Sequence, residues 1–133
     1  METGDLGIVG TGIDIVDVER IARAAERHGD RFLNRVFTPL EAEYCRSRGV
    51  PAQHLAGRFA VKEAVLKALK TGWSEGILWR EVEVSRSPSG EPSVQLSGAA
   101  QRRAEEMSIA RIHISISHTG NHAIAHAIAE TAE

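Results

Sequence analysis

The stretch from Leu55 to Lys70 limits the possible folds of this chain more than any other. Its apolar residues recur at the three- and four-residue spacing of a helix, which predicts one long helix with a broad apolar stripe. The remaining face carries four charged residues: Arg58, Lys62, Glu63 and Lys67. On pattern alone, a solvated face with an ordinary Glu63–Lys67 pair is the more usual interpretation. Three cations beside one carboxylate also suit a polyphosphate with a bridging metal.

Composition restricts the class of protein. A chain of 133 residues has the length of one domain, so we expect a single domain over residues 1–133, with residues 1–6 as a loose extension. The net charge of −2 argues against nucleic-acid binding through overall basicity. Cys45 is the only cysteine, which excludes an intrachain disulfide and a cysteine-based zinc cluster.

No membrane or export signal stands out in the sequence. No apolar run reaches the roughly 20 residues that span a bilayer. The first residues lack the basic and then apolar pattern of a signal peptide. Together with the single cysteine, these features lead us to expect a cytoplasmic protein that acts away from membranes.

The run from Gly7 to Ile15 predicts a strand that Gly10 and Gly12 interrupt. The two glycines match part of a dinucleotide-binding loop, but the third glycine of that motif is missing at the required place. Asp14 stands near the end of this strand, in the approach to a helix. A helix-start or turn role is common for an aspartate there, and the residues alone favour that role slightly.

A helix is expected from Asp17 to about Arg27, with Asp17 as its N-cap. Its polar side and the residues just beyond carry four arginines: Arg20, Arg23, Arg27 and Arg31. Such a face is usually only solvated. It could also dock an acidic partner, since arginine forms two-pronged contacts with carboxylates.

The segment Thr38–Glu41 predicts the start of another helix through a capping box, and this helix should end by Gly49 or before Pro51. Gly72 supplies the glycine that commonly follows a helix, here the long one. Alternating residues around 82–84 and 94–96 predict a hairpin, followed by a short helix with Ser97 as its cap.

The last stretch alternates apolar and polar residues over 112–117, turns at 118–121 and returns as a strand over 123–129. Three histidines recur every four residues: His118, His122 and His126. A helix would align them as zinc ligands, but a hairpin scatters them, so we expect no zinc site. His118, at the mouth of the turn, remains a candidate site residue. The alternative is a surface histidine that accepts a backbone hydrogen bond.

Helices and hairpins are interspersed along the chain. This order predicts an α+β fold with a mostly antiparallel sheet packed against the long central helix. Taken together, these stretches resemble the holo-acyl-carrier-protein synthase family, the small 4′-phosphopantetheinyl transferases. The matching segments are 12–17 with 20–21, 37–38 with Glu41, 57–64 with 67–68, 90–98 and 113–119. Two positions depart from the family: Lys70 replaces a usual glycine, and Glu81 replaces a usual aspartate.

The resemblance implies a transferase that moves the phosphopantetheine arm of coenzyme A onto a serine of an apo acyl carrier protein. Asp14 and Glu63 match the family's Mg²⁺ ligands. The matching coenzyme A contacts or active-site cations are Arg58, Lys62, Lys67, Gly72, His118 and Thr119. The family's small members are homotrimers with active sites between subunits. Their first helix receives the acidic carrier protein, which here implicates Arg20, Arg27 and Arg31.

These residue types suit that chemistry. Mg²⁺ needs few protein carboxylates beside phosphate and water oxygens, and Lys67 can neutralise a departing phosphate. The attacking serine must lose a proton. Glu63, through a metal-bound water, and His118 are both open as its acceptor. A non-catalytic module that binds coenzyme A or a nucleotide, and a structural oligomerisation domain, are the alternative functions.

Overall fold

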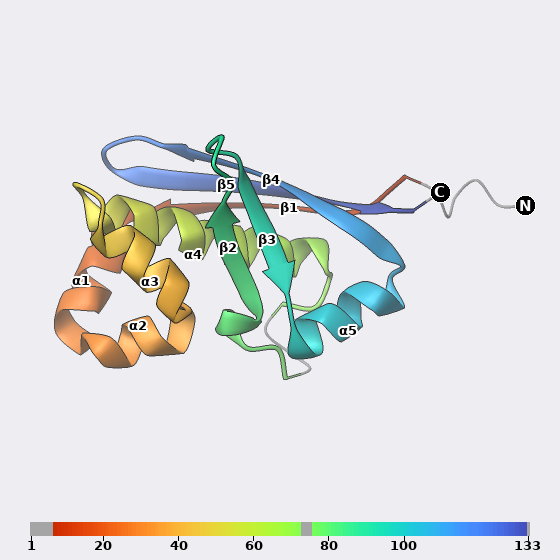
Figure 1. Ribbon diagram of the computed structural model, residues 1–133, viewed down its shortest axis with the longest axis horizontal. Coiled ribbons are helices and arrows are strands. Elements are labelled where there is room, and N and C mark those ends of the chain that lie inside the picture. The colour runs from red at the N-terminus through yellow and green to blue at the C-terminus, as the bar shows by residue number, and fades with distance from the viewer. Residues whose placement is uncertain (1–6, 73–75, 133) are drawn as a thin grey trace, which may run out of the picture.

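The computed structural model describes residues 7–72 and 76–132, and it lays a sheet over one long helix (Figure 1). The elements, in chain order, are β1 (Ile8–Asp17), α1 (Val18–His28), α2 (Asp30–Val36), α3 (Pro39–Arg46), α4 (Pro51–Ala68), the 3₁₀ turn η2 (Trp79–Glu81), β2 (Val82–Arg86), β3 (Pro92–Leu96), α5 (Gly98–Glu106), β4 (Ile109–His118) and β5 (His122–Thr131). The predicted α+β class is confirmed. The expected extension over residues 1–6 lies outside the described residues.

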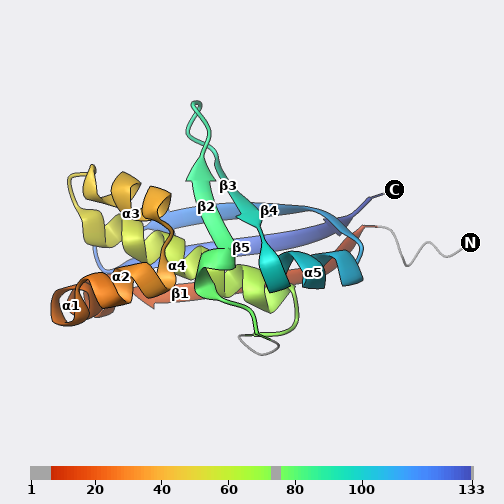
Figure 2. The same ribbon diagram turned by 60° about the horizontal axis from the view of Figure 1, so that its bottom comes forward.

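Two antiparallel sheets flank the long helix α4. The larger has the strand order β1-β5-β4, and β2 and β3 form a separate hairpin. The alanines of β5 at 123, 125, 127 and 129 are all buried and alternate with the outward residues of that strand. Figure 2 shows α1, α2 and α3 gathered toward one end of α4 and α5 near the other. The small alanine side chains let the sheet lie close to the helix.

Helix α4 is buried on nearly every side, which corrects the expectation of a solvated charged face. Its neighbours include β1, β5, α1, α3 and β2, so even Arg58 and Lys62 are only 2% and 0% exposed. It begins at Pro51, four residues before the predicted start, because proline is well suited to the first turn of a helix. None of the described helices has the length and apolarity that crossing a membrane requires.

Gly10 and Gly12 allow β1 to contact α4 at backbone distance. A Cβ atom on Gly10 would lie 2.1 Å from the carbonyl oxygen of Ala68, and one on Gly12 would lie 2.0 Å from that of Ala64. No side chain fits into such a space. The two glycines therefore serve packing, which explains why they resemble only part of a nucleotide-binding loop.

The predicted cap of the first helix is confirmed, because the Asp17 side chain accepts a hydrogen bond from the Glu19 N–H at 3.0 Å. The sequence interpretation missed α2. Gly29, with φ of 54°, ends α1, and the chain then makes two more turns of helix. Phe32 and Leu33 of that helix pack against the core.

Caps also fix the ends of α3 and α5. The capping box of α3 is confirmed: Thr38 Oγ accepts from the Glu41 N–H at 3.2 Å, and Glu41 Oε1 accepts from the Thr38 N–H at 2.9 Å. Ser97 precedes α5 as predicted, but its side chain makes no capping bond. Glu81 Oε1 accepts from the N–H of Ala100 instead, at 3.3 Å, so a glutamate from η2 caps this helix.

The sheet face that turns away from α4 is rich in large apolar side chains. Ile13 and Ile15 of β1 are 57% and 62% exposed. By register, Ile124 and His126 of β5 lie across from them. In Figure 1 the helices all lie on the other side of the sheet. This outer sheet face is therefore uncovered by the rest of the described chain.

Candidate active site

Asp14 and Lys67 join the first strand to the long helix. The Nζ of Lys67 lies 3.2 Å from Oδ1 of Asp14 and donates to the carbonyl oxygen of Ile13 at 2.8 Å. The Lys67 side chain is 54% exposed and that of Asp14 is 20% exposed. The pair thus opens to solvent. The simpler interpretations made Asp14 a helix-start or turn residue and paired Lys67 only with Glu63. The structure instead brings Asp14 and Lys67 into contact.

The register of β1 against α4 places Glu63 near this pair. The close contacts of the two β1 glycines show that β1 and α4 run in opposite directions, with two strand residues for one helical turn. Continuing this register past Gly12 places Asp14 level with the turn of α4 that precedes Ala64. Glu63 belongs to that turn and lies one turn before Lys67, which itself contacts Asp14. The two acids therefore flank one point of the seam between β1 and α4.

This arrangement fits a divalent cation held jointly by protein and substrate. Among the described residues, no three His, Cys, Asp or Glu side chains could hold a metal on their own. The ammonium group of Lys67 already contacts one carboxylate oxygen of Asp14. Mg²⁺ is commonly bound through one or two carboxylates, with phosphate and water completing its shell. Asp14 and Glu63 are donors of that kind.

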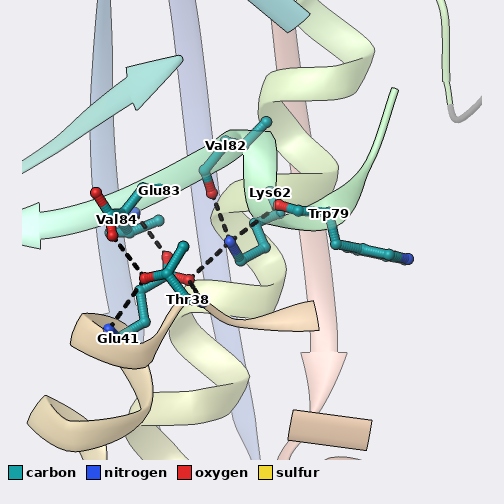
Figure 3. A network of polar contacts seen from close by, with 7 residues as sticks. All are labelled: Thr38, Glu41, Lys62, Trp79, Val82, Glu83 and Val84. Atoms are coloured by element: carbon teal, nitrogen blue, oxygen red, sulfur yellow. Dashed lines mark hydrogen bonds and ion pairs between the residues drawn. The ribbon is translucent and has the colours of Figure 1, made fainter. Parts of the chain in front are cut away.

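Lys62 was predicted as a coenzyme contact or active-site cation, but the structure buries it in a polar network of its own. Neither its side chain nor that of Glu41 has exposed surface, and its Nζ lies 2.9 Å from Glu41 Oε1. It also donates to the carbonyl oxygen of Trp79 at 3.1 Å and to that of Val82 (Figure 3). Burial lowers the pKa of Lys62 from its ordinary value, and the Glu41 carboxylate opposes that shift. Lys62 joins α4 to α3 and to the start of β2.

The role of Glu41 in this network was missed. Besides capping α3, its Oε2 accepts from the N–H of Val84 at 2.7 Å, and Thr38 Oγ donates to Glu83 Oε2 at 2.6 Å (Figure 3). A glutamate in a capping box is usually exposed, so the local motif gave no sign of burial. The only hint in the sequence is that Lys62 and Glu41 carry opposite charges and each lies among apolar residues.

A cationic cluster surrounds Tyr44 of α3, near the start of α4. The Cζ atoms of Arg58 and Arg48 lie 4.2 Å and 4.4 Å from the centre of the Tyr44 ring. The ring of His54 lies 6.0 Å from it, edge to face. The Nε of Arg58 is buried and has no hydrogen-bond partner within the described ranges. Arg58 was predicted as a phosphate contact; Arg48, Tyr44 and His54 were not singled out.

His118 lies at the edge of the same cluster. It ends β4, and its ring centre is 5.9 Å from that of His54. Its Nε2 is 3.0 Å from the carbonyl oxygen of Gln53, so this nitrogen donates, because a carbonyl can only accept. The alternative of a surface histidine bonded to the backbone is thus present in the structure, except that the ring donates the bond and does not accept it. Gly57 makes room for the ring: a Cβ there would lie 2.7 Å from Nε2.

The other two predicted coenzyme contacts lie in turns. The Oγ of Thr119 accepts from the N–H groups of Asn121 and His122 at 3.1 and 2.9 Å, which organises the turn between β4 and β5. Gly72 follows the end of α4, is exposed and has φ of 59°. The remaining histidine, His126, is exposed on the outer sheet face, so the expected scattering of the three histidines is confirmed.

The predicted docking arginines share one surface. A shallow groove on α1 is lined by Arg20, Arg23, Ala24, Arg27 and His28, and a second one by His28, Arg31, Phe32 and Arg35. Arg20 of the first groove also lies 5.8 Å from the ring centre of Phe59, which stacks on Trp79 at 4.8 Å. Arg35 was missed because α2 was not predicted. We call this surface, formed by α1 and α2, the arginine face.

Known proteins resemble this chain in sequence and in fold. The family model of the 4′-phosphopantetheinyl transferase superfamily matches residues 10–127. A holo-[acyl-carrier-protein] synthase of Koribacter versatilis is 46% identical over 123 residues, covering 92% of this chain and 98% of the relative. The holo-[acyl-carrier-protein] synthase structure from Neisseria meningitidis has a TM-score of 0.85 and 34% identity, covering 93% and 99%. That from Helicobacter pylori, in complex with coenzyme A, has a TM-score of 0.80 and 32% identity, covering 90% and 99%.

Proposed function

The chain belongs to the 4′-phosphopantetheinyl transferase superfamily, and we propose that it moves the 4′-phosphopantetheine arm of coenzyme A to a serine of an apo acyl carrier protein. The other product is adenosine 3′,5′-bisphosphate. The observation that carries this function is the Asp14–Lys67 pair, and the register of β1 against α4 places Glu63 near it. The similar proteins named holo-[acyl-carrier-protein] synthase, and the related structure with coenzyme A, support the same activity.

Asp14 and Glu63 are the residues that would hold Mg²⁺ in this enzyme. When bound, the ion supplies positive charge to the diphosphate oxygens of coenzyme A. Lys67 is the mobile cation of the site, because its exposed side chain reaches Asp14 through one long, flexible stem. Its ammonium group can leave Asp14 and neutralise charge on the phosphate.

The serine Oγ attacks the phosphorus that carries the pantetheine arm. The bond from that phosphorus to the oxygen bridging the two phosphates breaks, and this oxygen leaves with the adenosine bisphosphate. The serine proton goes to Glu63, directly or through water, or to His118. In the neutral ring of His118, Nε2 donates to Gln53, so Nδ1 is the nitrogen that can take the proton.

We also propose a homotrimer with active sites between subunits. The uncovered outer sheet face, with Ile13 and Ile15 exposed, supports self-association. A single small domain also has little room to enclose coenzyme A. The arginine face would receive the acidic carrier protein, and the single, buried Cys45 fits a cytoplasmic location.

A carrier-loading assay tests the proposed function. With coenzyme A, Mg²⁺ and apo carrier, the carrier should gain the mass of one phosphopantetheine. Asp14→Asn and Glu63→Gln should each lower kcat by at least about a hundredfold, since each weakens the binding of the cation that would supply positive charge to the phosphate. Glu105→Gln, an exposed carboxylate on α5, is the matched control and should keep full activity. Tight coenzyme binding without any transfer would instead identify a non-catalytic module, and full activity of both site variants would remove the metal assignment.

A further inference from the structure

We propose that His54 is a proton-linked anion ligand of this site, so that coenzyme A binds together with a proton. The proposal rests on the proposed function, because it assumes that a phosphate group of coenzyme A reaches the cationic cluster. It adds a residue and a regulation to that site. The position of His54, in the first turns of α4 between Tyr44 and His118, carries the argument.

The cluster has two buried nitrogen atoms without hydrogen-bond partners in the part of the chain that the structure describes. Arg58 is 2% exposed, yet its Nε has no hydrogen-bond partner among the described residues, and the same is true of the buried Nδ1 of His54. Leaving such groups unpaired is unfavourable by roughly 1–3 kcal/mol each. His54 and Arg58 are one helical turn apart, so their side chains lie on one side of α4. An anion that accepts from both groups would satisfy them.

The charges around His54 have one sign. It is flanked by Arg48 from the α3–α4 connection, Arg58 from α4, Arg86 from β2 and His118 from β4, and by the uncharged Tyr44 from α3. Burial first, and then the charges of His118, Arg58, Arg48 and Arg86, lower the pKa of His54 below its ordinary value. Without a ligand, burial and these charges therefore favour the neutral form of the ring.

A phosphate group reverses this balance. Its two negative charges offset the arginines and offer an acceptor to a protonated His54 ring. The pKa of His54 then rises in the complex. By linkage, binding takes up a proton in the pH range between the free and the bound pKa. Affinity for the anion should fall as pH rises through that range, by at most tenfold per pH unit.

Isothermal titration calorimetry with adenosine 3′,5′-bisphosphate tests the inference on the full chain. At pH 7.5 the phosphates are already mostly dianionic, so their own titration contributes little. Titrations in buffers of different ionisation enthalpy should show uptake of up to one proton by the wild type. His54→Phe keeps an aromatic ring beside Tyr44 but cannot be protonated. This variant should take up fewer protons than the wild type, by the fraction that His54 binds, and its affinity should depend less on pH. Equal proton uptake by wild type and His54→Phe would overturn the inference.

One measurement on the wild type makes the result independent of that variant. Nuclear magnetic resonance of the wild-type His54 ring should show its pKa rising by at least one unit on ligand addition, and no rise would also overturn the inference. His122→Gln, an exposed histidine on β5, should retain the wild-type proton uptake. Dephospho-coenzyme A identifies the anion: uptake lost with this ligand assigns the 3′-phosphate, and uptake retained assigns the diphosphate.

The carrier-loading assay separates this inference from the proposed function. If His54→Phe still loads carrier, and its KM for coenzyme A rises less with increasing pH than that of the wild type, the proton link holds. If transfer persists and the pH dependence of KM is identical in both proteins, only the His54 inference fails. If the wild type neither binds coenzyme A nor loads carrier, both fail together.

Discussion

The ammonium group of Lys62 lies 2.9 Å from the carboxylate of Glu41, and neither side chain has any exposed surface. The pair is held further by two backbone carbonyl groups on the lysine and by two backbone N–H groups on the glutamate. Such a network satisfies both charges at the junction of α3, α4 and β2. Removing one partner would leave the other charge buried without compensation, which is far worse than removing both.

Replacing Lys62 by methionine should therefore lower the free energy of unfolding by about 3–5 kcal/mol. The double variant Glu41→Gln/Lys62→Met should recover a large part of that loss, because no lone charge remains. Urea unfolding of the single and double variants measures both effects. In the folded Lys62→Met protein, the KM for coenzyme A should stay within about twofold of the wild type. A normal stability with a greatly raised KM would return Lys62 to the coenzyme site.

Cys45 should make the protein less stable in alkali. Burial raises the pKa of its thiol from 9.0 to about 11, against the opposing effect of Arg58. Between these values the unfolded chain loses the proton and the folded chain keeps it. Stability therefore falls as pH rises from 9 to 11, by about 1.4 kcal/mol per pH unit, and is unaffected well below pH 9.

Lys62 acts in the opposite direction over part of this range, since its lowered pKa means that the folded chain loses a proton first. Comparison with Cys45→Ala isolates the thiol, because both proteins contain Lys62. The stability difference between the two proteins should be constant up to pH 9 and should shrink above it. Chemical unfolding at pH 8, 9, 10 and 11 provides the measurement. A difference that stays constant to pH 11 would show that the thiol ionises normally in the fold.

Local signals predicted the elements best. The capping box at Thr38 and the cap at Asp17 depend only on side chains within three residues, and both are present in the structure. The alternation over 112–117 likewise predicted a strand, because a sheet with one covered face imposes a period of two. Helix α2 was missed because Gly29, a helix terminator, hides a second helix that begins directly after it.

Burial of charge could not be predicted in the same way. Lys62 and Lys67 are the same residue type on one helix, five positions apart, yet one is fully buried and the other is 54% exposed. What separates them is the cover that α3 and β2 place over the side of α4 where Lys62 lies. That cover comes from segments about 20 residues away on either side, so no local pattern reports it. The cluster around Tyr44 was missed for the same reason.

Lys70 offers a stabilising substitution. Its φ of 64° lies in the left-handed region, which is unfavourable for a residue with a Cβ by roughly 1–2 kcal/mol. The family's usual glycine at this position, noted from the sequence, has no such strain. Lys70→Gly should raise the free energy of unfolding by about 0.5–1 kcal/mol, after the greater freedom of glycine in the unfolded chain is counted. Lys70→Ala removes the same charge but keeps the strain, so it should not stabilise. Equal effects of both variants would assign the change to charge.

The outer sheet face should control assembly. Ile15 is 62% exposed there, and Ile15→Glu would place a charge where another subunit is expected to pack. Light scattering should give the wild type three times the chain mass of 14.5 kDa and give the variant a smaller mass. Leu40→Glu, at 70% exposure on α3, is the matched control and should leave the mass unchanged. A monomeric wild type would contradict the trimer, and a trimeric Ile15→Glu would place the interface elsewhere.

The arginine face should determine affinity for the carrier protein and leave coenzyme affinity unchanged. Arg27 is exposed in the groove on α1, so Arg27→Glu reverses one charge without disturbing the core. Opposite charges across an interface speed association, and reversal introduces repulsion toward an acidic partner. We expect the KM for carrier to rise about tenfold or more at low salt, and the difference from wild type to shrink as ionic strength increases.

Arg102→Glu controls for the change in net charge, because Arg102 is also exposed but lies on α5, near the other end of the long helix. Steady-state kinetics with each substrate varied in turn separate the two affinities. If the carrier docks on α1 and α2, only Arg27→Glu should raise the carrier KM, and both variants should keep the wild-type KM for coenzyme A. Equal increases in carrier KM would mean that the carrier responds to overall charge, and the arginine face would then have no special role in docking.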